Sequence, residues 1–251
     1  MSTPTPTPSL PSSPAPRYRR VLLKLSGEAF GPPGGFGLDP AEINQIADEI
    51  ALAHASGSQI AVVVGGGNII RGAHLAQAGG IPQATADHMG MLGTVINALA
   101  LKERLTTIGL DTRVQSAVEI RAVAETFIRG RAIRHMEKRR IVILAAGTGN
   151  PFFTTDTCAA LRATELECQV LLKATKVDGV YTADPKKDPK ATRLERLSFA
   201  QAIAQNLKVM DTAAFALCQE NNIPILVFDY KVKGNIARAV RGEALGTLVH
   251  A

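Results

Sequence analysis

Short apolar segments alternate with segments of helical periodicity along most of the chain, and this alternation is the strongest constraint on its fold. The segments typical of strands are Val21–Leu25, Ile60–Val64, Arg113–Ser116, Ile141–Leu144, Val170–Leu172, Ile225–Phe228 and Thr247–Val249. The segments typical of helices are Ala41–Ala55, Ala86–Leu105, a run from Thr155, Thr212–Glu220 and Ile236–Val240. The alternation predicts an α/β fold, and strands that are apolar throughout fit a mainly parallel sheet covered on both faces.

The first 16 residues differ from the rest because they alternate Pro with Ser and Thr. This composition cannot form a packed core, so we expect a disordered tail over 1–16. The chain has 251 residues, of which 46% are hydrophobic, and can bury a sizeable core. We therefore expect a single folded domain over 17–251.

Composition also limits the location and the partners. No apolar run is long enough to span a membrane and the N-terminus lacks the pattern of a secretion signal, so we expect a cytoplasmic protein. The three cysteines are widely spaced in apolar or helical contexts and are expected to be buried thiols. The net charge is +6, but the basic residues are scattered and Trp is absent, which favours small anionic ligands over nucleic acid.

A small-residue turn at 145–156 follows the predicted strand Ile141–Leu144. Gly147 and Gly149 allow close backbone approach, and Thr154, Thr155 and Asp156 are good capping residues for the helix that follows. The pattern indicates a phosphate-binding strand end, although an ordinary strand-to-helix turn is the alternative. The chain contains no GxxxxGK[ST] sequence, and Phe152 stands where a GxGxxG fingerprint needs its third glycine, which argues against a P-loop and a dinucleotide-binding protein.

Three further loops follow predicted strands, and the repetition predicts one ligand cleft at the strand ends. The first contains Lys24, a lysine inside an apolar strand, which would bind phosphate or extend to solvent. The second contains three consecutive glycines, 65–67, followed by Arg71, whose planar guanidinium suits phosphate. The third runs from Lys173 to Pro185 and contains Tyr181 and Asp184, which are placed to contact a nucleoside.

The predicted helix Ala86–Leu105 is apolar on nearly every side. From Met89 to Leu101 only Thr94 and Asn97 are polar. A helix of this kind is buried on several sides, so we expect part of it to pack against a second subunit. A central helix within one chain is the alternative.

Six segments of the chain resemble the bacterial uridylate (UMP) kinase branch of the amino acid kinase superfamily. They are KLSGEA (24–29), GGGNIIRG (65–72), ADHMGMLGTVINALA (86–100), AGTGNPFFTTD (146–156), LKATKVDGVYTADP (172–185) and KVMD (208–211). The resemblance extends from about Tyr18 to the C-terminus, and DHMGM together with GTGNPFFTTD points to the UMP branch. It implies a three-layer αβα sandwich with a mainly parallel sheet, an acceptor-binding N-terminal part and an ATP-binding C-terminal part.

The resemblance also implies an activity and its residues: MgATP-dependent transfer of the γ-phosphoryl group to UMP, giving UDP and ADP in pyrimidine nucleotide biosynthesis. The ATP contacts implied by motif are Lys24, Leu25, Ser26, Gly27, Gly67, Arg71, Thr175, Tyr181 and Asp184. The UMP contacts are Gly66, Asp87, Thr148, Gly149, Asn150, Pro151, Phe152, Phe153, Thr154 and Thr155. Asp87 suits the ribose hydroxyls, with a helix cap as the alternative.

Phosphoryl transfer requires alignment and charge neutralisation more than a strong base. Lys24 and Arg71 are the candidates for stabilising the transferring group. Asp156 and Asp211 are the candidates for orienting Lys24 or the Mg²⁺ shell, with a helix-capping role as the alternative. No residue is assigned as a direct metal ligand.

The family resemblance implies a homohexamer built as a trimer of dimers, activated by GTP and inhibited by UTP. Lys102, Arg113 and Arg140 are the effector candidates, while Lys102 and Thr106 depart from the Arg and His of some members. Two other functions stay open at this point. One is a superfamily kinase acting on a carboxylate or carbamate, and the other is a nucleotide sensor without turnover.

Overall fold

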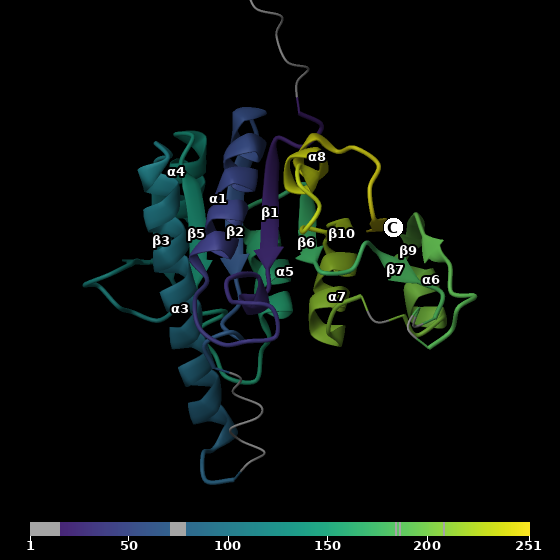
Figure 1. The fold of residues 1–251 in the computed structure, drawn as a ribbon, viewed down its shortest axis with the longest axis horizontal. Helices are drawn as coiled ribbons and strands as arrows, with labels where there is room; N and C mark the ends of the chain where they lie inside the picture. The colour runs from purple at the N-terminus through teal and green to yellow at the C-terminus, as the bar shows by residue number, and fades with distance from the viewer. Residues whose placement is uncertain (1–15, 71–78, 184, 186, 208) are drawn as a thin grey trace, which may run out of the picture.

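A nine-stranded sheet forms the centre of the computed structural model, which describes residues 16–70, 79–183, 185, 187–207 and 209–251 (Figure 1). The strand order is β4-β3-β5-β2-β1-β6-β10-β11-β9, and all neighbours are parallel except the antiparallel pair β10–β11. The strands are β1 (Arg20–Leu25), β2 (Gln59–Val64), β3 (Thr112–Ser116), β4 (Glu125–Thr126), β5 (Ile141–Ala145), β6 (Val170–Thr175), β9 (Arg196–Ser198), β10 (Ile225–Asp229) and β11 (Thr247–His250). A separate antiparallel pair joins β7 (Val180–Tyr181) and β8 (Arg193–Leu194).

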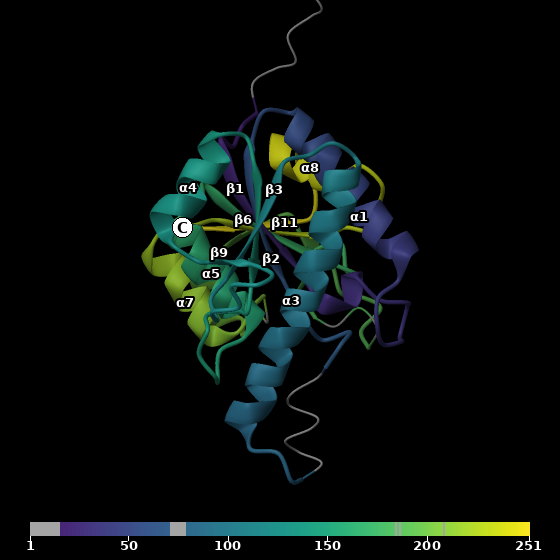
Figure 2. The same ribbon diagram turned by 90° about the vertical axis from the view of Figure 1, so that its left-hand side faces the viewer.

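Helices cover both faces of the sheet, as the edge-on view in Figure 2 shows. One layer contains α1 (Pro40–Ala55), α3 (Gln83–Thr107) and α8 (Asn235–Arg241). The other contains α4 (Arg129–Glu137), α5 (Thr155–Glu165), α6 (Phe199–Ala204) and α7 (Thr212–Glu220). The predicted three-layer αβα sandwich with a mainly parallel sheet is therefore confirmed.

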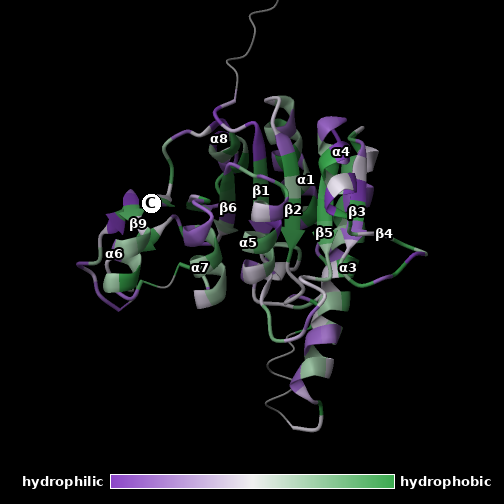
Figure 3. Cartoon of the chain, turned by 180° about the vertical axis from the view of Figure 1, so that it is seen from behind, coloured by the Kyte–Doolittle hydropathy of each residue, from purple (hydrophilic) through white to green (hydrophobic). Residues whose placement is uncertain are grey.

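The strand sequences explain the two layers. All six residues of β1 are buried, and successive side chains point to opposite faces. Val21, Leu23 and Leu25 belong to the core under α1, α3 and α8, whereas Leu22 belongs to the core under α4, α5, α6 and α7. The central strands are largely green in the hydropathy colouring of Figure 3, as a sheet covered on both faces requires.

The helices that start next to the strand ends are fixed by side-chain caps. The Asp39 side chain accepts a hydrogen bond from the N–H of Ala41 and is followed by Pro40 at the first turn of α1. Thr154 caps α5, and Asp211 caps α7. These caps fix the point at which each loop turns into a helix, and so the position of the loop.

Helix α3 is longer than the sequence prediction at both ends, and its amino-terminal end extends away from the sheet (Figures 1 and 2). Its inner face contains buried residues, whereas the side chains of Leu92 and Ile96 are 51% and 43% exposed. The inner face of α3 thus fits a central helix within one chain, whereas the face with Leu92 and Ile96 is not covered by the described part of the chain.

The structure adds elements that the sequence prediction lacked: β4, β7, β8, β9, α4, α6 and the 3-10 turn η1 (Gly27–Ala29). Most are short, and α4 has the composition of a surface helix, since only Ala132 and Met136 are buried. The three cysteines are free and buried as expected, and burial raises the pKa of Cys158 to about 11. No helix in the described part of the chain is long and apolar enough to cross a membrane.

Candidate active site

Two neighbouring cavities open where the parallel strands end. The first, of about 470 Å³, is called the glycine-loop cavity here. Its lining comes from η1 and its cap, the glycine loop, α3 and segment 147–155: Ser26, Gly27, Glu28, Gly65, Gly66, Gly67, Ile70, Ala86, Asp87, Gly90, Met91, Thr94, Gly147, Thr148, Phe153, Thr154 and Thr155. Three of the four predicted loops therefore meet at one place.

The second cavity, of about 580 Å³, lies beside β6 and is called the β6 cavity here. Its lining includes Lys173, Thr175, Tyr181 and Val209. The fourth predicted loop therefore lines a cavity of its own. Asp156 connects the two cavities, because it follows Thr155 of the first and bonds to Lys173 of the second.

A buried cluster of two lysines and one aspartate stands at this junction. Lys24 on β1 and Lys173 on β6 are directly paired in the sheet register. The Asp156 side chain reaches both from the first turn of α5: its Oδ1 lies 2.8 Å from the Nζ of Lys24, and its Oδ2 lies 2.6 Å from the Nζ of Lys173. All three side chains are at most 15% exposed, so a Lys24 side chain that extends into solvent is excluded.

The electrostatics of the cluster follow from burial and neighbouring charge. Burial disfavours the charged form of Asp156, but the ammonium groups of Lys24 and Lys173 outweigh that effect and lower the pKa of its carboxyl. Burial lowers the pKa of Lys173, and the Asp156 carboxylate partly offsets it. Two cations share one anion, so the cluster has a net positive charge at the place where a phosphate would lie.

Asp211 occupies a helix-capping position at the start of α7. Its Oδ1 accepts hydrogen bonds from Thr157 Oγ1 and from the N–H of Ala214, both at 2.9 Å, and its Oδ2 accepts one from Thr154. Within the described residues it forms no ion pair with Lys24. The contacts of Asp211 are therefore those of the capping alternative: it caps α7 and fixes the start of α5, from which Asp156 projects. Its predicted part in the Mg²⁺ shell stays a prediction.

Asp87 lines the glycine-loop cavity, but it is not a helix cap because α3 begins at Gln83. Its Oδ2 accepts a hydrogen bond from the N–H of Phe152 at 2.8 Å, and its Oδ1 accepts one from Gln83 at 2.7 Å. Asp87 thus ties segment 147–155 to α3. The capping alternative is excluded, and the carboxylate stays at the cavity wall.

Segment 147–155 contributes only part of its length to the cavity. Thr148, Phe153, Thr154 and Thr155 line it together with Gly147. The other predicted UMP contacts in this segment lie outside the lining: Gly149, Asn150, Pro151 and Phe152. Phe152 has a positive φ of 71° and a side chain that is 75% exposed.

The glycine loop is in direct backbone contact with its neighbours. A Cβ on Gly66 would lie 2.6 Å from the carbonyl oxygen of Gly90 on α3, and one on Gly27 would overlap the backbone N of Gly67. A side chain on Gly27 or Gly66 would push the loops apart, so the close approach of three backbones requires glycine at these two positions. Leu25, a predicted ATP contact, has its side chain in the core, and only its backbone reaches the loop, through its carbonyl oxygen 2.8 Å from the N of Gly65.

The remaining predicted nucleotide contacts divide into two groups. Tyr181 and Thr175 line the β6 cavity, and the Tyr181 hydroxyl donates to Asp178 at 2.8 Å. Arg71 and Asp184 lie outside the described residues, as does Lys208 of the KVMD motif. The prediction for those residues stays a prediction.

Lys173 is a site residue to which the sequence pattern alone assigned no role. Its signal was present in the sequence, because Lys173 interrupts the apolar run of β6 as Lys24 interrupts that of β1. The pairing of the two strands, which turns two separate lysines into one cluster, is not visible in the sequence.

The effector candidates lie at the far edge of the sheet. Lys102 and Arg113 line a cavity of about 410 Å³ beside β3 and β4. Arg140 is not in that lining, but its Nε donates to Asp111 Oδ2 at 2.6 Å, and Arg113 pairs with the same carboxylate. Asp111 therefore connects two of the three predicted effector residues.

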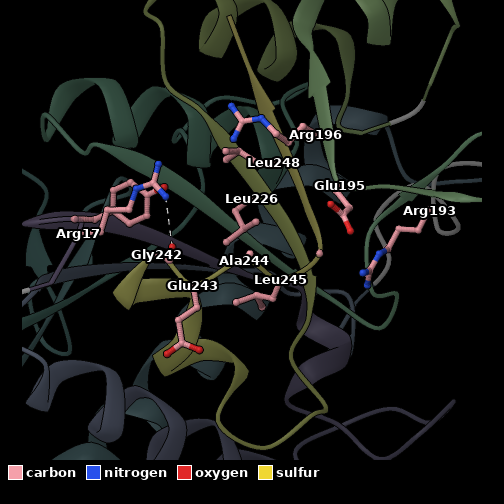
Figure 4. Close-up of a pocket in the computed structure, with 12 residues that line it drawn as sticks. Arg17, Arg193, Glu195, Arg196, Leu226, Gly242, Glu243, Ala244, Leu245 and Leu248 are labelled. Carbon is pink, nitrogen blue, oxygen red and sulfur yellow. Dashed lines mark hydrogen bonds between the residues drawn. The ribbon is translucent and has the colours of Figure 1, made fainter.

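A further cavity, of about 250 Å³, contains none of the predicted site residues (Figure 4). Arg17, Arg193 and Arg196 stand around it, and Leu226, Leu245 and Leu248 contribute apolar surface. Arg17 rests on the backbone of Gly242, beyond the end of α8 and close to the amino end of β1. This cavity lies at the opposite end of β1 from Lys24 and the two strand-end cavities.

The side chains of the site limit how an Mg²⁺ ion would be held. In the described part of the chain no three His, Cys, Asp or Glu side chains are placed to hold a metal ion. Both Asp156 oxygens are paired with lysines. Such a donor set leaves substrate phosphates and water as the main ligands of an Mg²⁺ ion, which commonly keeps several waters and binds substrate phosphates in phosphoryl-transfer sites.

A parallel sheet with glycine loops and a buried lysine pair at its strand ends defines an α/β protein built to bind phosphorylated small molecules. The sequence model described as "Amino acid kinase family" matches residues 19–229. The chain belongs to the amino acid kinase family.

Individual relatives agree with this family and with the fold. A protein named "Uridylate kinase" from Zymomonas mobilis is 56% identical over 234 residues, which cover 93% of this chain and 96% of the relative. The crystal structure of UMP kinase from Bacillus anthracis shares 40% identity and a TM-score of 0.90 over 93% of this chain and 96% of its own. UMP kinase from Ureaplasma parvum shares 37% identity and a TM-score of 0.87 over 94% of this chain and 100% of its own.

Proposed function

We propose that the protein is a uridylate kinase, which transfers the γ-phosphoryl group of ATP to UMP and forms UDP and ADP. The observation that carries the proposal is the buried Lys24–Asp156–Lys173 cluster at the junction of two cavities. An enzyme that transfers a phosphoryl group between two nucleotides needs two binding sites with a charged group between them. The two cavities and the cluster between them fit this requirement. The names of the similar proteins support UMP as the acceptor.

Phosphoryl transfer requires the protein mainly to align the two substrates and to neutralise the charge of the transferring group. An oxygen of the UMP phosphate forms a bond to the γ-phosphorus of ATP, while the bond from that phosphorus to the β–γ bridging oxygen breaks and ADP leaves with the electron pair. Negative charge on the transferring group is neutralised by the Lys24 ammonium and by backbone N–H groups of the glycine loop. Asp156 holds both lysines in place, and the guanidinium of Arg71 would add a planar fork of N–H donors.

Each cavity then takes one nucleotide. UMP occupies the glycine-loop cavity, where Asp87 faces the ribose and Thr148, Thr154 and Thr155 face the pyrimidine nucleotide. The nucleoside of ATP occupies the β6 cavity beside Thr175 and Tyr181, with its phosphates directed toward Lys24 and Gly27. Mg²⁺, when bound, neutralises phosphate charge and fixes the phosphate geometry.

Assembly and regulation complete the proposal. The exposed side chains of Leu92 and Ile96 on α3 support a homo-oligomer, with a trimer of dimers as the expected form. GTP as activator and UTP as inhibitor would act through Lys102, Arg113 and Arg140, and the cavity beside β3 supports a ligand at this edge. We place the enzyme in the cytoplasm, in pyrimidine nucleotide biosynthesis.

The test measures ADP formation from MgATP with UMP, CMP, dUMP, acetylglutamate and aspartate as separate acceptors, each with and without GTP. We expect turnover that is selective for UMP. Turnover with a carboxylate alone would overturn the proposal in favour of a different amino acid kinase. UMP binding without turnover would overturn it in favour of a nucleotide sensor.

A further inference from the structure

Two buried asparagines form a reciprocal amide pair behind the glycine loop. Asn68 follows that loop and is 1% exposed, and Asn97 on α3 is fully buried. The Nδ2 of Asn68 donates to the Oδ1 of Asn97 at 3.0 Å, and the Nδ2 of Asn97 donates to the Oδ1 of Asn68 at 2.7 Å. The two side chains therefore bind each other through both amide groups.

The second N–H of each amide binds a backbone carbonyl of a different segment. Asn97 donates to the carbonyl oxygen of Gly65 at 2.7 Å, and Asn68 donates to that of Gly37 at 2.8 Å. All four amide hydrogens of the pair are thus used. A buried polar group with every bond satisfied holds its neighbours in one arrangement, whereas apolar side chains of the same size would not specify a position.

The pair also lies against the Ser26–Gly27 turn, a predicted ATP-binding segment. A Cβ on Gly27 would be 2.8 Å from the Oδ1 of Asn68. Asn68 therefore touches the Ser26–Gly27 turn, the glycine loop and the 31–37 loop, while Asn97 joins all of them to α3. Three backbone segments converge on these two side chains, and two of them, the Ser26–Gly27 turn and the glycine loop, line the glycine-loop cavity.

Asn97 belongs to a stripe on α3 that holds the remaining loops of the glycine-loop cavity. Asp87 accepts from the N–H of Phe152, and the Oγ1 of Thr94 accepts from the N–H of Ala146 at 2.7 Å. Asp87, Thr94 and Asn97 recur at helical spacing on one face. One rigid helix thus fixes the backbone of both phosphate-binding segments around that cavity.

We infer that the Asn68–Asn97 amide pair is a positioning device for phosphoryl transfer, which sets the glycine loop at a fixed distance from the Ser26–Gly27 turn. The inference rests on the proposed function, because it gives that loop the task of holding a transferring phosphate. Neither asparagine touches a nucleotide in this account. Both act through the backbone of 65–67.

The test compares Asn68→Ala, Asn97→Ala, the double variant and Gln59→Ala as a matched control. Gln59 is a buried amide that accepts from Arg20 at the amino end of β2, away from both cavities. We expect kcat to fall about 100-fold in either single variant while KM for UMP and ATP rises less than about fivefold, since misplacement by about 1 Å costs that much in rate. The double variant should lose no more than about threefold beyond a single one, because the pair acts as a unit. Gln59→Ala should keep kcat.

Hydrogen exchange supplies a readout that does not depend on activity. In Asn97→Ala, amides in 31–37 and 64–70 should exchange faster, while those of β5 keep their protection. Unchanged kcat in a variant with a lower Tm, or unchanged exchange in both loops, would overturn the inference. If the native protein shows no UMP turnover, the proposed function fails, and the exchange result still decides whether the pair holds the loops. If Asn97→Ala does not fold, Asn68→Ser, which can bond only one of the two partners at a time, takes its place with the same expected outcomes.

Discussion

The molecule builds the same charge pattern twice, once at the centre of the sheet and once at its edge. In the central cluster Asp156 lies between Lys24 and Lys173, and in the edge cluster Asp111 lies between Arg113 and Arg140. The central side chains are 10–15% exposed. The edge side chains are 25–50% exposed.

The environment decides what each cluster can do. Water and salt screen the edge cluster, so its ion pairs contribute little to stability, although its arginines stay available to an anion. In the central cluster desolvation strengthens every electrostatic interaction, and removal of one partner leaves an uncompensated charge. The comparison teaches that burial, rather than the type of residue, separates the proposed catalytic centre from a surface network of ion pairs.

The largest effect is expected from Lys24→Met. The variant loses the ammonium that we propose stabilises the transferring group, and kcat should fall about thousandfold, in the range measured for other phosphate clamps. Steady-state ADP formation with UMP measures it, with the exposed Lys138→Met as the charge-matched control. Near-normal turnover in Lys24→Met would remove the central cluster from the mechanism.

Lys173→Met should have a smaller effect, because Lys173 also has a positioning task. Its Nζ donates to Val209 and to Asp156, both at 2.6 Å, and so holds the carboxylate that holds Lys24. We expect a loss of about 100-fold in kcat, and a double variant with Lys24→Met that is no worse than Lys24→Met alone, since members of one unit are not additive. Fully multiplicative losses would mean that the two lysines act independently.

Much of the fold is predictable from the sequence because one face of each long helix and both faces of each central strand are apolar. The strand Ile141–Leu144 and the helix Thr212–Glu220 lie where periodicity places them. The two-residue strands β4, β7 and β8 are not predictable in this way, because pairing with a distant partner creates them. The start of α3 at Gln83, ahead of the predicted Ala86, follows a Pro82 cap rather than a polar capping side chain.

The sequence predicts which loops form the site, but it does not predict which side chains of those loops and strands contact one another. Glycine runs and capping residues placed four loops at the strand ends, and Lys24 stood out in its strand. The Lys24–Lys173 register and the Asn68–Asn97 pair depend on which strands and helices become neighbours, which no local pattern reports. Asp211 illustrates the opposite case, because this aspartate of a family motif has the contacts of a helix cap, and its predicted part in the Mg²⁺ shell stays a prediction.

Asp156→Asn tests the central cluster through pH. The pKa of Asp156 is lowered in the folded protein, so its contribution to stability is fully present above the ordinary pKa of an aspartate and is lost as the pH falls through the lowered value. At neutral pH the variant should be less stable by about 3 kcal/mol, the typical result of removing one partner of a buried pair. Urea unfolding of both proteins should show this gap narrowing below about pH 4, where the unfolded aspartate becomes protonated. A gap that stays constant down to pH 3 would mean that the charge of Asp156 does not stabilise the fold.

Asp111→Asn should have the smallest effect. Its carboxylate is half exposed and pairs with two arginines that water also solvates, so the loss of stability should be at most about 1 kcal/mol. The loss should shrink further between 0.05 and 1 M salt, because the Debye length falls to about 3 Å and screens the remaining attraction. Urea unfolding at both salt concentrations measures it, with Asp156→Asn run in parallel as the buried counterpart, whose larger loss should respond less to salt. A loss of more than about 2 kcal/mol at Asp111, insensitive to salt, would place the edge cluster outside the range of exposed ion pairs. Burial would then not explain how the central and the edge cluster differ in their contribution to stability, and the geometry of the ion pairs would have to explain it.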